Sequence, residues 1–72
     1  MVVHYQNLLR DLCIRKNWQP PVYHRASGAG AEAVVFNVEI LNRLIRGDPA
    51  DSDEVAKEEA AKNAFLVFGD QL

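Results

Sequence analysis

The alanine-rich stretch from Asp53 to Phe68 constrains the fold more than any other feature of the sequence. Its small and apolar residues recur at spacings of three and four, the period of one buried helix face; they are Ala56, Ala60, Ala61, Ala64, Phe65 and Phe68. Asp51 or Ser52 can cap such a helix, and the acids Asp53 and Glu54 suit the positive end of its dipole. Alanine side chains let the helix approach its neighbour closely. The stretch therefore predicts a helix over about 53–68 that packs on a sheet.

A second helical pattern lies near the start of the chain, over about 4–18. Its apolar residues also recur at spacings of three and four; they are Tyr5, Leu8, Leu9, Leu12 and Cys13. Asn17 and the pair Pro20-Pro21 end the pattern, because proline lacks the donor that a helix needs and restricts the residue before it.

The middle of the chain has the period of strands. Val22–Arg25 alternates after the prolines and predicts a strand over about 22–26. In the next segment, about 34–41, Val34, Phe36, Val38 and Ile40 alternate with Val35, Asn37 and Glu39. That segment, extended to residue 46, also fits a helix, but its Val, Ile and Phe content favours a strand.

On the strand interpretation, Asn42-Arg43 is a tight turn and a third strand covers about 44–47. The order of elements then predicts one α+β domain over 1–72, of the form α-β-β-β-α. We expect a three-stranded antiparallel sheet with both helices packed on one face.

Length and composition argue against an enzyme. The chain has 72 residues, of which 49% are hydrophobic. A chain this short needs nearly all of these residues for its own core, which leaves few to line a deep substrate pocket. Neither zinc-site nor protease spacing accompanies His4, Cys13 and His24, so we expect no metal, no cofactor and no catalysis. The acids Glu58 and Glu59 are interpreted as part of a solvated helix face.

The single cysteine cannot form an internal disulfide, which excludes a disulfide-stapled secreted fold. The longest apolar runs are only a few residues, so we expect no membrane span. The first residues lack the pattern of a signal peptide, which favours a cytoplasmic or nuclear setting.

Charge is divided unevenly along the chain, although the net charge is only -2. Residues 1–46 carry six Arg and Lys against three acids, whereas residues 47–72 carry two lysines against seven acids. A surface that relied on phosphate contacts everywhere would show a basic excess, and this chain shows none.

Taken together, the order of elements and two local patterns resemble the double-stranded RNA-binding domain family. The resemblance runs from about Tyr5 to Phe65. Its specific residues are the strand entry Pro21-Val22-Tyr23 and the closing run of Ser52, Ala56-Lys57 and Ala60-Ala61-Lys62-Asn63-Ala64-Phe65. Domains of this family touch 2′-hydroxyls in two successive minor grooves of A-form RNA and the phosphates between them.

The resemblance implies three RNA-binding regions in this chain. Asn7 and Asp11, one helical turn apart, match positions that approach 2′-hydroxyls. Ser27 and Gly28 lie in the loop of residues 27–32, which matches the second region. Lys57 matches a lysine that contacts the major-groove phosphates at the start of the last helix.

This last region departs from the family pattern. The family has Lys-Lys-x-Ala-Lys there, and this chain has Asp53-Glu54-Val55-Ala56-Lys57. Two lysines are thus replaced by two acids beside a phosphate lattice, and we expect a weakened affinity for duplex RNA. The second region also lacks the family's Gly-Pro pair and histidine, since Ala29 follows Gly28.

Two functions follow from the resemblance. The first is a non-catalytic module that binds double-stranded RNA by its shape, in an RNA-processing or RNA-silencing protein. The alternative is a degenerate domain that binds a protein partner or forms a homodimer. Its candidate interface comprises Leu44 and Ile45 on the third strand with Val67 and Phe68 at the end of the last helix.

Overall fold

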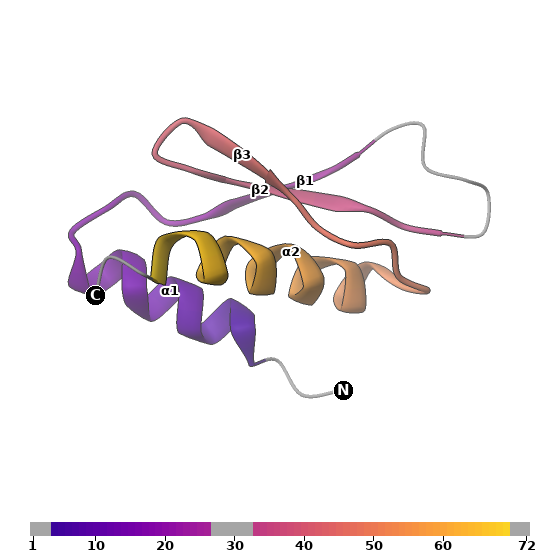
Figure 1. The fold of residues 1–72 in the computed structure, drawn as a ribbon, viewed down its shortest axis with the longest axis horizontal. Helices are drawn as coiled ribbons and strands as arrows, with labels where there is room; N and C mark the ends of the chain where they lie inside the picture. The colour runs from indigo at the N-terminus through magenta and orange to yellow at the C-terminus, as the bar shows by residue number, and fades with distance from the viewer. Residues whose placement is uncertain (1–3, 27–32, 70–72) are drawn as a thin grey trace.

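The computed structural model describes residues 4–26 and 33–69. Its elements are α1 (Tyr5–Arg15), β1 (Val22–Arg25), β2 (Phe36–Ile40), β3 (Arg43–Arg46) and α2 (Asp53–Phe68). The strands form one antiparallel sheet in the order β1-β2-β3. Both helices lie on the same face of this sheet, with α2 along β2 and β3 and α1 beside α2 (Figure 1). The predicted α-β-β-β-α fold class is therefore confirmed.

α1 ends at Arg15, ahead of the predicted limit near residue 18. Asn17 adopts a left-handed conformation with a φ of 61°, and its N–H donates to the Ile14 carbonyl at 3.1 Å. The Trp18 N–H then donates to the Cys13 carbonyl at 2.8 Å. These two bonds form a Schellman motif, which stops the helix before the prolines are reached.

The turn between β2 and β3 differs from the expected one. Leu41 and Asn42 occupy it, with φ values of 53° and 63°, and β3 already begins at Arg43. Two consecutive left-handed residues are what a two-residue hairpin turn requires, because their twist matches that of the paired strands. The predicted turn at Asn42-Arg43 was displaced by one residue.

Val35 also departs from the predicted alternation, because it is buried beside its buried neighbour Phe36. The β2–β3 register would place Val34 opposite Pro49, which has no N–H. Val34 instead pairs with Ala50, with N–H to carbonyl distances of 2.8 and 2.9 Å. This one-residue shift ends the regular two-residue period at the start of β2.

The core lies between the sheet and the helices. Val38 and Ile40 from β2 meet Leu9, Leu12 and Cys13 from α1 and the alanines of α2. Ala56, Ala60, Ala61 and Ala64 are each 0% exposed, which fits the close approach of α2 predicted from the sequence. The last helix of the sequence interpretation, 53–68, has the same bounds in the structure.

Candidate nucleic-acid interface

The exposed positions of α1 are held in place from α2. The Glu58 carboxylate accepts hydrogen bonds from the backbone N–H groups of His4 at 2.8 Å, Tyr5 at 2.5 Å and Gln6 at 3.1 Å. These are donors that the first turn of a helix leaves without an intrahelical partner. Glu58 thus caps α1 from a neighbouring element and fixes the direction in which α1 projects its outer side chains.

The electrostatics of Glu58 agree with this role. Burial raises the pKa of its carboxyl, but the hydrogen bonds from Tyr5, Gln6 and His4 outweigh burial and hold the pKa below its ordinary value. The interpretation of Glu58 as a solvated acid was wrong. Its spacing gave no signal, because the contact joins residues more than 50 positions apart.

Asn7 and Asp11 both lie on the exposed side of α1. They are one turn apart, so their side chains project from the same part of the helix surface. Ser27 and Gly28, the predicted loop contacts, lie outside the described residues.

Lys57 lies on the first turns of α2, near the end of β1. Ser52 caps this helix, since its hydroxyl accepts the Val55 N–H at 3.3 Å. The Lys57 ammonium lies 5.3 Å from the centroid of the Phe36 ring, and the residue is half-buried. Phe36 is in turn the register partner of Arg25 on β1. Lys57 and Arg25 are therefore the basic residues that flank Phe36 at this end of the sheet.

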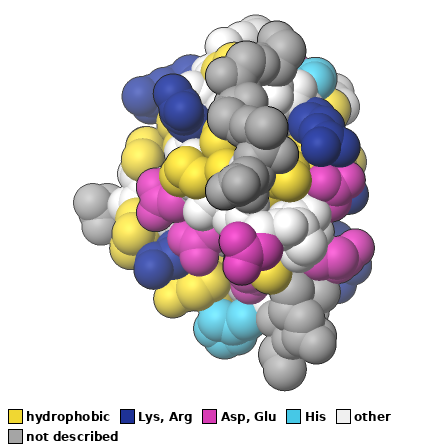
Figure 2. Space-filling model, turned by 90° about the vertical axis from the view of Figure 1, so that its right-hand side faces the viewer, with side chains coloured by type: hydrophobic (Ala, Val, Ile, Leu, Met, Phe, Trp, Pro, Cys, Tyr) yellow, Lys and Arg dark blue, Asp and Glu magenta, His cyan; other side chains and the backbone are white. Residues whose placement is uncertain are grey.

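Acidic residues are numerous in the segment that leads into α2 and in the first turn of that helix. The exposed acids of the segment that enters α2 and of its first turn are Asp48, Asp51, Asp53 and Glu54. Figure 2 shows this end of the molecule, with acidic side chains across its middle and Lys and Arg side chains toward the margins. One acid is paired: Arg25 Nη1 lies 3.5 Å from Asp53 Oδ1, and both side chains are more than half exposed. Such an exposed pair contributes little to stability.

The four residues of the candidate partner interface fall into two groups. Leu44 is 60% exposed on the outer face of the sheet and Val67 is 41% exposed on α2. Phe68 is buried, with Trp18 edge-on at 5.7 Å and the Arg43 guanidinium 5.5 Å from its ring centroid. Ile45 packs against the core. Phe68 thus belongs to the interior and Ile45 is partly buried against it, so Leu44 and Val67 are the exposed members of this set.

Cys13 is buried, and burial raises the pKa of its thiol, as expected of a small apolar core residue. In the described part of the chain, no three His, Cys, Asp or Glu residues lie close enough together to hold a metal ion. Nor does any described helix combine the length and apolar character needed to cross a membrane.

The element order, the strand order and the placement of both helices define the class: this is the fold of the double-stranded RNA-binding domain. No family model and no curated protein matches the chain by sequence. Solved structures do match it. The second such domain of DRB4 superimposes with a TM-score of 0.67 at 29% identity, over 93% of this chain and 97% of that one.

Two further structures have the same fold. Arabidopsis HYL1, studied for its implications for miRNA processing, gives a TM-score of 0.79 at 15% identity, over 90% of this chain and 96% of that one. A double mutant of the double-stranded RNA-binding domain of human tRNA-dihydrouridine(20) synthase gives a TM-score of 0.82 at 18% identity, over 93% of this chain and 71% of that one. The resemblance inferred from the sequence is therefore confirmed at the level of the fold.

Proposed function

We propose that this chain is a non-catalytic module that binds double-stranded RNA by the shape of the A-form duplex. The observation that carries the proposal is the fold, which packs α1 against α2 and holds Lys57 over the ring of Phe36, the register partner of Arg25. Solved structures of the same fold are described as double-stranded RNA-binding domains.

The proposed contacts follow the three regions of the family. Asn7 and Asp11 on α1 reach 2′-hydroxyls in one minor groove, and Ser27 and Gly28 reach the next. Lys57 contacts the phosphates between them, supported by the N–H groups at the start of α2. The parent protein acts on RNA, in processing or silencing, in the cytoplasm or the nucleus.

The proposed affinity is lower than that of a domain with a full lysine cluster. Asp53 and Glu54 repel phosphates at the position where lysines would attract them, and Asp53 also neutralises Arg25 at 3.5 Å. Binding is accordingly expected at low salt, with a salt slope shallower than that of a domain with the full lysine cluster.

Lys57→Gln tests the proposed phosphate contact. We expect affinity for a 20-base-pair RNA duplex to fall about fivefold, the equivalent of about 1 kcal/mol, and the salt slope to fall by about one. The matched control is Lys62→Gln, which removes the same charge from an exposed site further along α2. Equal losses in the two variants would mean that Lys57 acts only through net charge, which contradicts the proposed contact.

A further inference from the structure

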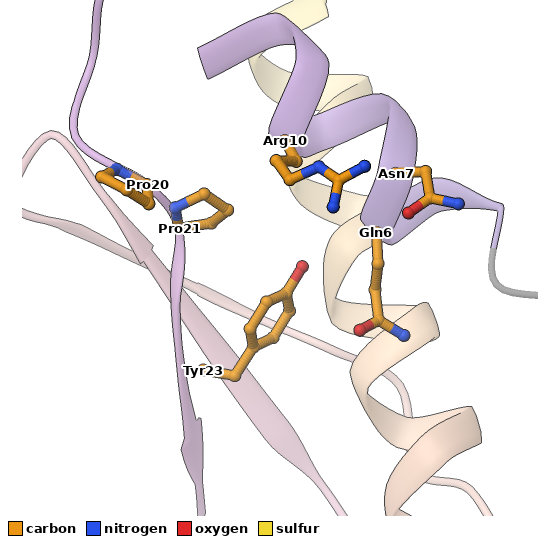
Figure 3. A pocket seen from close by; sticks show the side chains of 6 residues that line it. All are labelled: Gln6, Asn7, Arg10, Pro20, Pro21 and Tyr23. Carbon is orange, nitrogen blue, oxygen red and sulfur yellow. The ribbon is translucent and has the colours of Figure 1, made fainter. Parts of the chain in front are cut away.

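A groove of about 240 Å³ separates α1 from the segment that enters β1; its lining residues are Gln6, Asn7, Arg10, Pro20, Pro21 and Tyr23. Gln6, Asn7 and Arg10 form one wall, and the two proline rings with Tyr23 form the other (Figure 3). None of these lining residues is acidic, although the chain as a whole carries a net negative charge. Arg10 is thus the one charged residue among the described residues that line the groove, and the Glu58 carboxylate lies behind the lining, hydrogen-bonded to Gln6.

The described part of the fold provides no hydrogen-bond partner for the Tyr23 hydroxyl. It is buried and has no hydrogen-bond partner, and Figure 3 shows it pointing from β1 toward Arg10 and Gln6 on α1. Burial, with a smaller effect of the Glu58 charge, raises the pKa of Tyr23 to about 12, so the hydroxyl remains a donor at neutral pH. A buried hydroxyl without a partner is costly, and an oxygen that enters the groove would supply the missing acceptor.

Arg10 supplies the charge. The residue is exposed, and no carboxylate of the described residues forms an ion pair with it. A guanidinium binds phosphate oxygens with charge-assisted hydrogen bonds, often two at once. The neighbouring Gln6 is held in position, because its side-chain amide donates to Glu58 at 3.4 Å.

We infer that this groove binds one phosphate of the RNA backbone, through the guanidinium of Arg10 and the hydroxyl of Tyr23. The source of the phosphate rests on the proposed function, whereas the oxyanion chemistry would be the same for free phosphate. The inference adds a charged contact from α1 and a neutral contact from β1 to the three regions that the family resemblance implies.

Three variants test the inference in duplex RNA titrations at several salt concentrations. Arg10→Gln should weaken binding at least fivefold and lower the salt slope by about one. Arg15→Gln removes the same charge from an exposed position of α1 outside the groove, and should change affinity less than twofold. Tyr23→Phe should weaken binding about threefold with an unchanged slope, because the lost donor carries no charge.

The Tyr23→Phe variant should fold as the wild type does, since the hydroxyl makes no hydrogen bond in the free chain. Its thermal midpoint serves as the check. Equal effects of Arg10→Gln and Arg15→Gln, or wild-type affinity of Tyr23→Phe, would overturn the inference.

A second measurement separates the groove from the proposed function. Inorganic phosphate titrated into the wild type should move the NMR signals of Arg10 and Tyr23, and should leave the Tyr23 signal unmoved in Arg10→Gln. If phosphate moves both wild-type signals while duplex RNA does not bind, the groove stands and the proposed function fails. A different result would refute only the inferred phosphate site and leave the proposed function standing. In that case RNA binds normally, phosphate moves neither signal, and the variants bind RNA like the wild type.

Discussion

Gly47 determines how closely α2 can approach the sheet. A Cβ built on this buried residue would lie 2.6 Å from the backbone nitrogen of Ala60 and 2.7 Å from its Cα. These are backbone atoms of a packed helix, so they cannot move aside independently. The absence of a side chain at Gly47 therefore allows the backbone of α2 at Ala60 to pack directly against the residue that follows β3.

Gly47→Ala should accordingly destabilise the fold. Overpacking of this kind costs about 1–3 kcal/mol, and we expect the lower denaturant midpoint that corresponds to it. Gly69→Ala is the matched control, because its Cβ would meet only the Phe65 ring, at 3.7 Å or more. A Gly47→Ala variant as stable as Gly69→Ala would show that the sheet and α2 are less tightly packed than described.

Glu58 makes the attachment of α1 sensitive to acid. Its pKa in the folded chain lies below the ordinary value of 4.5, so its contribution to stability is complete above that value. The contribution is lost as pH falls through the lowered folded-state pKa. Protonation thus removes the charged cap from the first turn of α1.

Glu58→Gln should cost about 1 kcal/mol at neutral pH, the usual value of a helix cap. Between pH 7 and pH 3 this variant should lose less stability than the wild type, because the carboxylate that titrates is gone. Denaturant unfolding at the two pH values measures both effects. Glu59→Gln is the control, since its side chain makes none of the three backbone contacts, and a loss equal to that of Glu58→Gln would contradict the capping role.

At the scale of elements, the predictability of the structure depended on the range of the interactions. α2 could be bounded from the sequence because its cap, its acids and its alanine period are all local. The hairpin turn was displaced by one residue, since Leu41 is not a residue that normally marks a left-handed conformation. The burial of Val35 depends on the distant bridge between Val34 and Ala50.

The candidate site divides in the same way. Asn7, Asp11 and Lys57 come from the family resemblance, which assigns them positions on α1 and α2, and their contact with RNA remains a prediction. Other features join residues of different elements, and the periodicity of the sequence could not predict them. They are the Glu58 cap, the Arg25–Asp53 pair and the groove at Tyr23. Charge pairing across elements can be inferred only once the register of the strands is known.

The first turn of α2 is where the sequence agrees least with the proposed function, because acids stand where phosphate contacts are proposed. Asp53→Lys with Glu54→Lys restores the family's charges there and releases Arg25 from its ion pair. We expect affinity for duplex RNA to rise at least tenfold and the salt slope to increase by about two. Helix stability should fall by about 1 kcal/mol, because acids suit the first turn of a helix better than lysines do.

The control for this double variant is Glu39→Lys with Glu59→Lys, which changes the net charge equally on β2 and on later turns of α2. Fluorescence anisotropy at several salt concentrations compares the two. An equal gain from both would assign the effect to net charge, and no gain from either would show that the start of α2 does not face RNA.

At the scale of the whole molecule, the fold is shared with double-stranded RNA-binding domains while its charge is not distributed as in a general polyanion binder. Residues 1–46 carry a basic excess and residues 47–72 an acidic one. At the end where α2 begins, acidic side chains lie across the middle and Lys and Arg side chains toward the margins (Figure 2). Under the proposed function, binding rests on a few contacts to an A-form surface, so the chain should discriminate between RNA and DNA duplexes of the same sequence.

The most direct test is a titration of the wild-type chain with a 20-base-pair RNA duplex and with the DNA duplex of the same sequence, at several salt concentrations. We predict RNA-selective binding at low salt whose logarithm falls linearly with the logarithm of the salt concentration. Equal binding to RNA and DNA, or no binding to RNA at the lowest salt, would contradict the proposal that this fold reads duplex RNA by its shape.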